Sequence, residues 1–245
     1  MSKLLRGRTR DDSGFTLIEF LVAMSVMVVL LTVSLTVVKG ATGLVGTTQD
    51  QQNLNEEARQ AINRMSRDIR QASKIVTAVN PDGASFDPTK LVAVRFTSDF
   101  DGDGCIDGTG GASCLAYNPS NPEDVTYCYE PSSRQLYVID NNALGVTPIA
   151  ATSTSCSGGQ PLLAGNVAAF KVSYRSNIYR DDLNPTDGVT TWTELDESGV
   201  PDGNNDGKLD VELANVDSVV LDLTMKLGGH QQPYRTQVDL RNQSQ

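Results

Sequence analysis

A run of 24 residues with a single charge constrains this chain more than any other feature. Residues 15–38 are apolar or carry small hydroxyl side chains, except for Glu19. A helix rises about 1.5 Å per residue and needs about 20 apolar residues to cross the hydrocarbon core of a membrane. The apolar run of a cleavable secretory signal is shorter, about 7–15 residues. The sequence therefore predicts a membrane-spanning helix over residues 15–38.

Glu19 is the one charged side chain in this run. A carboxylate in a spanning segment costs about 2.5–3.5 kcal/mol near the bilayer centre and less close to an end. One interpretation is an acid that lies among the headgroups without a role. The other is an acid that meets a positive group inside a protein assembly. A cut between Gly14 and Phe15 would create such a group, because the new amine would lie about one helical turn from Glu19 and could approach it from a neighbouring copy.

The residues around this junction resemble a known family. The segment Gly14-Phe15-Thr16-Leu17-Ile18-Glu19 is similar to the processing motif of type IV prepilins and type II secretion pseudopilins. The resemblance implies that a prepilin peptidase cleaves after Gly14 and that Phe15 becomes the N-methylated mature terminus. It also implies that Glu19 neutralises the terminal amine of a neighbouring subunit during filament assembly.

Residues 1–14 would then be a prepilin leader. Its bases outnumber its acids; they are Lys3, Arg6, Arg8 and Arg10 against Asp11 and Asp12. Basic flanks stay on the cytoplasmic side of a membrane. We therefore expect a single-pass protein of the cytoplasmic (inner) membrane with an extracytoplasmic C-terminal head, which becomes part of a cell-surface or periplasmic filament after assembly.

A second helical pattern follows the apolar run. Residues 39–77 are predicted to form an amphipathic helix that continues into the head. Its apolar positions recur every three or four residues and are Leu54, Ala58, Ala61, Ile62, Met65, Ile69, Ala72 and Val76. The face opposite this stripe is charged. Such a stripe is also typical of an ordinary surface helix packed on a sheet. We predict this packing for the segment and, in addition, that it continues the membrane-spanning helix.

Residues 78–245 carry strand patterns and no second long helix. The predicted strands are 91–96, 125–130, 135–140, 167–176, 216–227 and 234–241. Without helices between them, parallel βαβ units are disfavoured and an antiparallel meander is favoured. The predicted fold class is α+β: a pilin-like fold in which one long N-terminal helix packs on an antiparallel β-sheet head.

The resemblance extends less specifically into the head. Residues 58–72 are similar to the post-membrane helix of PilW-like and GspJ-like minor pilins, and residues 236–242 are similar to the closing strand of that group. The head is larger than that of many major pilins. Both features favour a minor subunit over the main building block of a filament.

Two loops rich in Asp and Gly have the spacing of oxygen ligands around calcium. Residues 99–107 and 202–210 place oxygen side chains at loop positions 1, 3, 5 and 9, a backbone carbonyl at 7 and glycine at 6. The candidate ligands are Asp99, Asp101, Asp103, Cys105 (backbone) and Asp107, and Asp202, Asn204, Asp206, Lys208 (backbone) and Asp210. Position 12 lacks the usual Glu, since Gly110 and Leu213 occupy it. Asp, Asn and Gly are also what ordinary turns contain. Because the spacing occurs twice, we predict at least one weak calcium site.

The four cysteines all lie in the head, at Cys105, Cys114, Cys128 and Cys156. An even count outside the cytoplasm favours two disulfides, and three pairings are open. A bond between Cys105 and Cys114 would brace the first Asp/Gly loop. A zinc site is disfavoured because no pair has Cys-x-x-Cys spacing. His230, the one histidine, lies in a Gly-rich stretch and is expected in a loop.

The charge balance bears on the partners. The chain carries −10 and the leader +2, which leaves −12 for the mature part. No basic stripe is available to follow phosphates, so nucleic-acid binding is not predicted; DNA uptake through a local patch stays open. The expected partners are other pilin or pseudopilin subunits, prepilin peptidase, membrane lipid before assembly and, indirectly, the assembly platform and its ATPase.

The sequence as a whole predicts a minor pilin or pseudopilin, a structural subunit of a filament for pilus biogenesis, secretion or DNA uptake. The alternative is a membrane-anchored, calcium-binding adhesion or interaction module. An anchored enzyme is less favoured, because no nucleophile elbow, zinc-protease motif, phosphate loop or Ser/His/Asp set can be identified. We expect no catalytic residues, and no cofactor apart from calcium.

Overall fold

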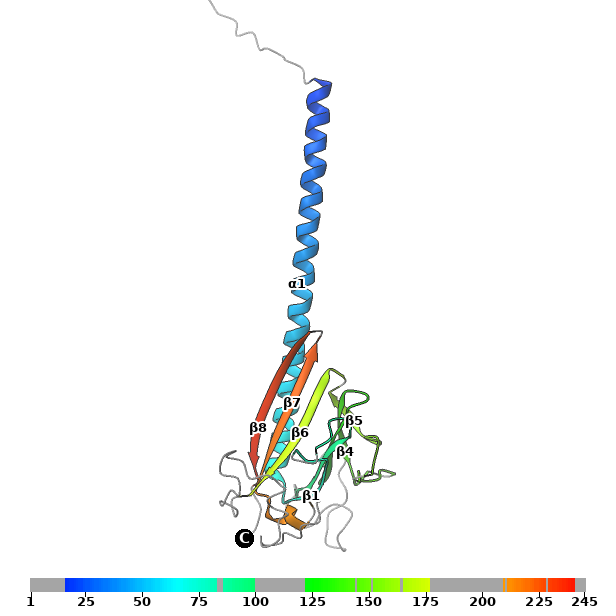
Figure 1. Cartoon of the computed structure of the whole chain (residues 1–245), viewed down its shortest axis with the longest axis vertical. Coiled ribbons are helices and arrows are strands. Elements are labelled where there is room, and N and C mark those ends of the chain that lie inside the picture. The colour runs from blue at the N-terminus through cyan, green and yellow to red at the C-terminus, as the bar shows by residue number, and fades with distance from the viewer. Residues whose placement is uncertain are drawn as a thin grey trace, which may run out of the picture. The chain divides into compact units, whose positions relative to one another are not determined.

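A computed structural model describes residues 16–82, 86–99, 122–143, 145–150, 152–163, 165–176, 209, 211–227 and 229–240 (Figure 1). The chain divides into two units, Met1–Gln52 and Asn53–Gln245. One helix, α1 (Leu17–Gln71), supplies the described part of the first unit and the first element of the second.

The first unit contains the apolar helix that the sequence predicts. Leu17–Gly40 is long and apolar enough to span a membrane, with a mean hydropathy of 2.6, and none of it is buried. The hydroxyl groups of Ser25, Thr32 and Thr36 donate hydrogen bonds to carbonyls of the preceding turn, as Thr32 Oγ1 does to Val28 O at 2.8 Å. Polar groups satisfied within the helix are what a segment surrounded by hydrocarbon requires. This finding agrees with the predicted span, although Phe15 lies outside the described residues.

In the second unit the predicted apolar stripe of α1 is buried. Ala58, Met65 and Ile69 have no exposed surface. The predicted end of the helix at residue 77 is wrong, since α1 ends at Gln71 and strand β1 spans Lys74–Val79. The β-branched run at 75–77 explains the change, because such side chains favour a pleated strand over a helix.

In the residues that the structure describes, the head contains two antiparallel sheets, whereas the sequence predicted one. The first sheet has the order β1-β2-β3-β4-β5, and its further strands are β2 (Val92–Thr97), β3 (Asp124–Glu130), β4 (Gln135–Asp140) and β5 (Gln160–Leu163). The second sheet has the order β6-β7-β8, with β6 (Val167–Arg175), β7 (Ser218–Leu227) and β8 (His230–Asp239). All the pairings are antiparallel, so the predicted α+β class and the meander are confirmed. A short 3₁₀ helix, η1 (Val211–Asn215), precedes β7.

Strand β8 corrects one residue-level prediction. His230 is the first residue of this strand and pairs with Leu227 of β7, so it does not lie in a loop. Pro233 is also within β8, opposite Thr224. A proline is tolerated there because β8 is the edge strand of its sheet and needs to donate hydrogen bonds on one side only.

One apolar core joins α1 to both sheets. Phe96 of β2 stacks on Tyr127 of β3 at 5.9 Å between ring centroids, and Tyr129 contacts Phe170 of β6 edge to face at 6.4 Å. Figure 1 shows β6, β7 and β8 alongside the part of α1 that belongs to this unit. The sheets thus enclose the stripe of the helix.

A partly buried hydrogen bond joins α1 to the five-stranded sheet. Tyr127 has no exposed surface, and its hydroxyl donates to Asp68 Oδ2 at 2.6 Å. Burial, and then the neighbouring Asp68 carboxylate, raise the pKa of Tyr127 far above its ordinary value. The hydroxyl therefore stays protonated and keeps donating to the helix.

The other face of the five-stranded sheet carries a smaller apolar cluster closed by a disulfide. Cys128 of β3 is bonded to Cys156, in the segment between β4 and β5. A side chain at Gly159 would place its Cβ 2.8 Å from Cβ of Tyr137, so only glycine allows this segment to lie so close to β4. The bond selects one of the three pairings, and the remaining two cysteines, 105 and 114, lie outside the described residues.

A polar network lies on the same face. Arg95 Nε donates to Asp124 Oδ1 at 2.8 Å, and Asn141 Nδ2 donates to the same oxygen at 2.8 Å. The Asp124 side chain is 6% exposed and that of Arg95 24%. Hydrogen bonding to Asp124 raises the pKa of Arg95. The guanidinium thus compensates a carboxylate that is almost completely removed from water.

We expect Arg95→Ala to lower the free energy of unfolding by about 2–3 kcal/mol, because it leaves the Asp124 charge buried. This is less than the loss typical of a fully buried pair, since Arg95 is partly exposed. Arg235→Ala is the matched control: its pair with Asp222 spans 3.6 Å and Arg235 is 61% exposed, so its removal should cost less than about 1 kcal/mol. Urea unfolding of the purified chain, followed by near-UV circular dichroism, measures both. Equal losses would contradict a structural role for the Arg95–Asp124 pair.

Candidate functional site

The first turn of α1 holds the candidate assembly residue. Thr16 precedes the helix, and its backbone N–H donates to Glu19 Oε2 at 3.0 Å. The Thr16 hydroxyl donates to the same oxygen at 3.1 Å and accepts from the Glu19 N–H at 3.4 Å. This is a capping box, in which Thr at the N-cap and Glu three residues later satisfy each other's backbone donors. The acid also compensates the partial positive charge of the helix N-terminus.

The capping box fits the proposed processing of the chain. The N–H of Thr16 belongs to the Phe15–Thr16 peptide bond, so a cut before Phe15 would leave this donor in place. Within the described residues, the two hydrogen bonds that the Glu19 carboxylate accepts both end on Oε2, which leaves Oε1 for another donor. The carboxylate is therefore both held by its own helix and open to a second partner. Neither interpretation of Glu19 in the sequence included this local role, although the Thr-x-x-Glu spacing could have indicated it.

Most of the other predicted site residues lie outside the described part of the chain. This holds for the processing junction at Gly14 and Phe15, and for Cys105 and Cys114. It also holds for the candidate calcium ligands at 101, 103, 105, 107, 202, 204, 206, 208 and 210. Asp99 is described and is exposed after the end of β2. In the described ranges no three His, Cys, Asp or Glu side chains gather as metal ligands would. Calcium binding by the two Asp/Gly loops therefore stays a prediction.

A polar hollow on α1 is a feature that the sequence did not single out. It has a volume of about 370 Å³ and is lined by Asn63, Ser66, Arg67, Arg70 and Gln71. Sequence reasoning treated the arginines as part of a solvated face opposite the apolar stripe. Their recurrence with Asn63 and Ser66 at intervals of three and four residues places these side chains on one side of the helix, which is the signal that could have found them.

Comparison with known proteins bears on the N-terminus of the chain. The prokaryotic N-terminal methylation motif matches residues 9–35. No curated protein matches the chain significantly. A solved type IV-like pilin from Thermus thermophilus is similar at 13% sequence identity and a TM-score of 0.42, with 79% of this chain and 100% of that chain covered. A structural likeness this low carries no argument, so the class of the protein rests on the motif.

Fold and motif together define a class. The chain is an α+β protein in which a long apolar helix, exposed on all sides, follows a prepilin-type methylation motif. The motif supports the type IV pilin family that residues 14–19 predict, and with it a pilin-like subunit. Helix and motif also indicate a protein anchored in a membrane.

We expect Thr16→Ala to destabilise the first turn of α1 by about 1 kcal/mol, because the capping hydroxyl is lost. Amide hydrogen exchange in detergent micelles should then accelerate about fivefold at Glu19, whose N–H donates to the Thr16 hydroxyl, and at Phe20, whose N–H donates to Thr16 O. Thr16→Ser keeps the hydroxyl and should exchange like the parent chain. Thr36→Ala removes a mid-helix hydroxyl that donates to Val33 O and should leave the first turn unchanged. Unaltered exchange in Thr16→Ala would show that the capping box does not hold Glu19.

Proposed function

We propose that this protein is a subunit of a type IV pilus-like filament, processed by a prepilin peptidase between Gly14 and Phe15. The observation that carries the proposal is the methylation motif at residues 9–35, followed directly by an apolar helix with none of its surface buried. A helix of this kind needs either lipid or other helices around it. The helix of a filament subunit is surrounded by lipid before assembly and by other helices after it.

During assembly, the apolar helix would exchange its lipid surroundings for contacts with neighbouring helices. The leader and its positive charge keep the N-terminus cytoplasmic until cleavage. The helix then stays in the bilayer until an assembly ATPase and its platform protein extract it. In the filament, the apolar side chains from Leu17 to Gly40 pack against the equivalent helices of neighbours, and the Phe15 amine of one subunit approaches Glu19 of the next.

Glu19 would make this packing specific. A carboxylate surrounded by apolar helices is costly unless an opposite charge lies beside it. The open Oε1 offers that position to an incoming amine, while the capping box keeps the carboxylate oriented along the first turn. Attraction between the two charges would then fix the axial register of neighbouring helices.

The finer assignment that we propose is a minor pilin or pseudopilin. It is supported by the large two-sheet head, whose strands extend from Lys74 to Asp239 in the described structure, and by the similarity of residues 58–72 to minor pilins. The filament could serve pilus biogenesis, secretion or DNA uptake. We infer no catalytic role for the head.

We expect Gly14→Ala, or a bulkier residue at this position, to block removal of the leader, because the peptidase must accommodate the residue before the cut. Mass spectrometry of the chain from cells with and without prepilin peptidase detects the change. Gly40→Ala is the matched control, because a Cβ there meets nothing within 4 Å, and it should be processed normally. Normal processing of the Gly14 variants would contradict cleavage at this junction.

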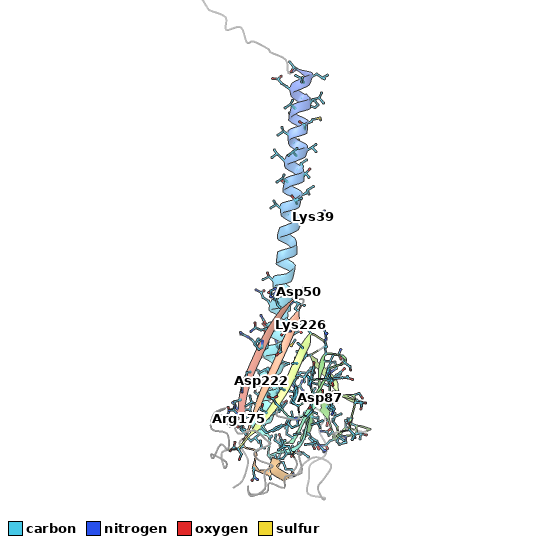
Figure 2. The ribbon with its side chains drawn as sticks, viewed as in Figure 1. Lys39, Asp50, Asp87, Arg175, Asp222 and Lys226 are labelled. Carbon is cyan, nitrogen blue, oxygen red and sulfur yellow. A yellow bond between two sulfur atoms is a disulfide. The ribbon has the colours of Figure 1, made fainter. Side chains whose placement is uncertain are left out.

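We expect Glu19→Ala to leave processing largely intact and to lower incorporation into filaments at least tenfold, since the incoming amine loses its partner. Incorporation is measured as the fraction of processed chain in sheared filaments. The control is Asp50→Ala, which removes an exposed acid from the same helix (labelled in Figure 2) and should assemble normally. Normal assembly of the Glu19 variant would rule out the charge pair.

A further inference from the structure

The hollow on α1 has the chemistry of a site for an oxyanion. Each of its five lining side chains carries a hydrogen-bond donor: two guanidinium groups, two amides and one hydroxyl. Ser66 Oγ is buried and has no hydrogen-bond partner among the residues that the structure describes. A buried hydroxyl without a partner within the described residues keeps its donor for a group from outside the chain.

The arginines of the hollow are only partly compensated within the chain. Arg67 is 69% exposed and its nearest carboxylate oxygen, on Asp68, is 3.5 Å away. Asp68 also accepts the Tyr127 hydroxyl and lies 3.8 Å from Arg64. Arg70 makes no ion pair in the part of the chain that the structure describes. The hollow therefore keeps an excess of positive charge, whereas the chain as a whole carries −10.

An exposed acid lies on the opposite flank of the same helix. Glu57 precedes Arg70 by thirteen residues, which at 3.6 residues per turn places the two side chains about 140° apart around α1. The exposed face of the helix, with Arg67 and Gln71, fills this arc, and the buried stripe, with Ala58, Ile62 and Met65, fills the remaining arc on the side that packs on the sheets. The exposed face of α1 thus has the acid Glu57 at one edge and Arg70 and Ser66 at the other, with the rest of the hollow between them.

We propose that the hollow receives the Glu57 carboxylate of a second copy of this chain, packed parallel and side by side. The proposal rests on the filament function proposed above, because copies anchored in one membrane have parallel helices. Neighbours related by one repeated step meet through different faces, so the Glu57 edge of one copy is opposite the Arg70 edge of the next. A minor subunit forms this contact wherever two copies are adjacent.

The spacing along the helix sets the geometry of the contact. Ten residues separate Glu57 from Arg67 and thirteen separate it from Arg70, so the second copy would be displaced by about 15–20 Å along the helix axis. The same distance prevents Glu57 from reaching the hollow of its own chain. A second copy is favoured over a phosphate ligand because the acid and the donors that would bind it are both on this helix.

The test exchanges the charges in the full chain. Two differently tagged copies are expressed in cells with prepilin peptidase, and recovery of the second tag with the first is measured after shearing. Arg67→Glu with Arg70→Glu should lower recovery about fivefold, since two exposed ion pairs become repulsive. Glu57→Arg alone should also lower it. A chain that carries all three substitutions should recover to the parent level.

The controls separate this contact from general effects of charge. Arg134→Glu and Lys226→Glu reverse two other exposed bases (Lys226, on β7, is labelled in Figure 2) and should not change recovery. Leader removal and co-purification of other filament subunits should persist in every variant, so a loss of those signals would count against the filament function and not against the hollow.

Three results would overturn the contact between copies. The first is unchanged recovery of the second tag when Arg67 and Arg70 are reversed. The second is a triple variant whose recovery is as low as that of the variants with only one side reversed. The third is release of the parent copies by inorganic phosphate at matched ionic strength, together with a triple variant that does not restore recovery. The last result would identify the hollow as a phosphate site. As a direct check, carbodiimide should join the Arg70→Lys side chain to Glu57 across a mixture of ¹⁴N- and ¹⁵N-labelled chains.

Discussion

The exposure of the apolar half of α1 is the constraint on which the rest of the structure depends. No described part of the chain covers the side chains from Leu17 to Gly40, and Figure 2 shows side chains projecting on all sides of this part of the helix. Burying a single Val, Leu, Ile, Phe or Met side chain is worth about 1.5–3 kcal/mol, so the sixteen that are exposed here make an aqueous monomer strongly unfavourable. Lipid or other helices must cover this segment. A filament subunit, whose helix is surrounded first by lipid and then by other helices, is consistent with the methylation motif at residues 9–35.

The head depends on the second half of the same helix. Its stripe from Ala58 to Ala72 lies in one core with both sheets, and the Tyr127–Asp68 hydrogen bond specifies which face of α1 turns inward. A helix whose propensity alone would be marginal gains stability from this packing. The sheets thereby fix the orientation of the exposed face, where Glu57 and Arg70 lie on opposite flanks.

Short sequence patterns predicted the features that depend on a single segment of the chain. The spanning run, the apolar stripe and the strand Gln135–Asp140 were readable because one period or one turn identifies each. β1 was missed because Ile75 and Val76 also continue the helical spacing, and only pairing with β2 decides for a strand. The split into two sheets depends on pairing between segments far apart in the sequence, and the pattern of a single strand does not indicate its partners. The capping role of Glu19 could have been predicted, because the Thr-x-x-Glu spacing is present in the sequence. The interpretation of Glu19 considered only its charge in a membrane helix, and so it included assembly but not capping.

The two electrostatic features of α1 differ in their surroundings, and this separates their roles. Glu19 lies in an apolar segment, where an ion pair is screened little and its loss leaves a charge without compensation. Arg67 and Arg70 lie on a wet surface, where salt at physiological strength screens charges beyond about 8 Å. The first contact can therefore decide whether a subunit enters an assembly at all. The second is weaker and reversible, and through the distance between Glu57 and the hollow it selects how far neighbouring helices slide past each other.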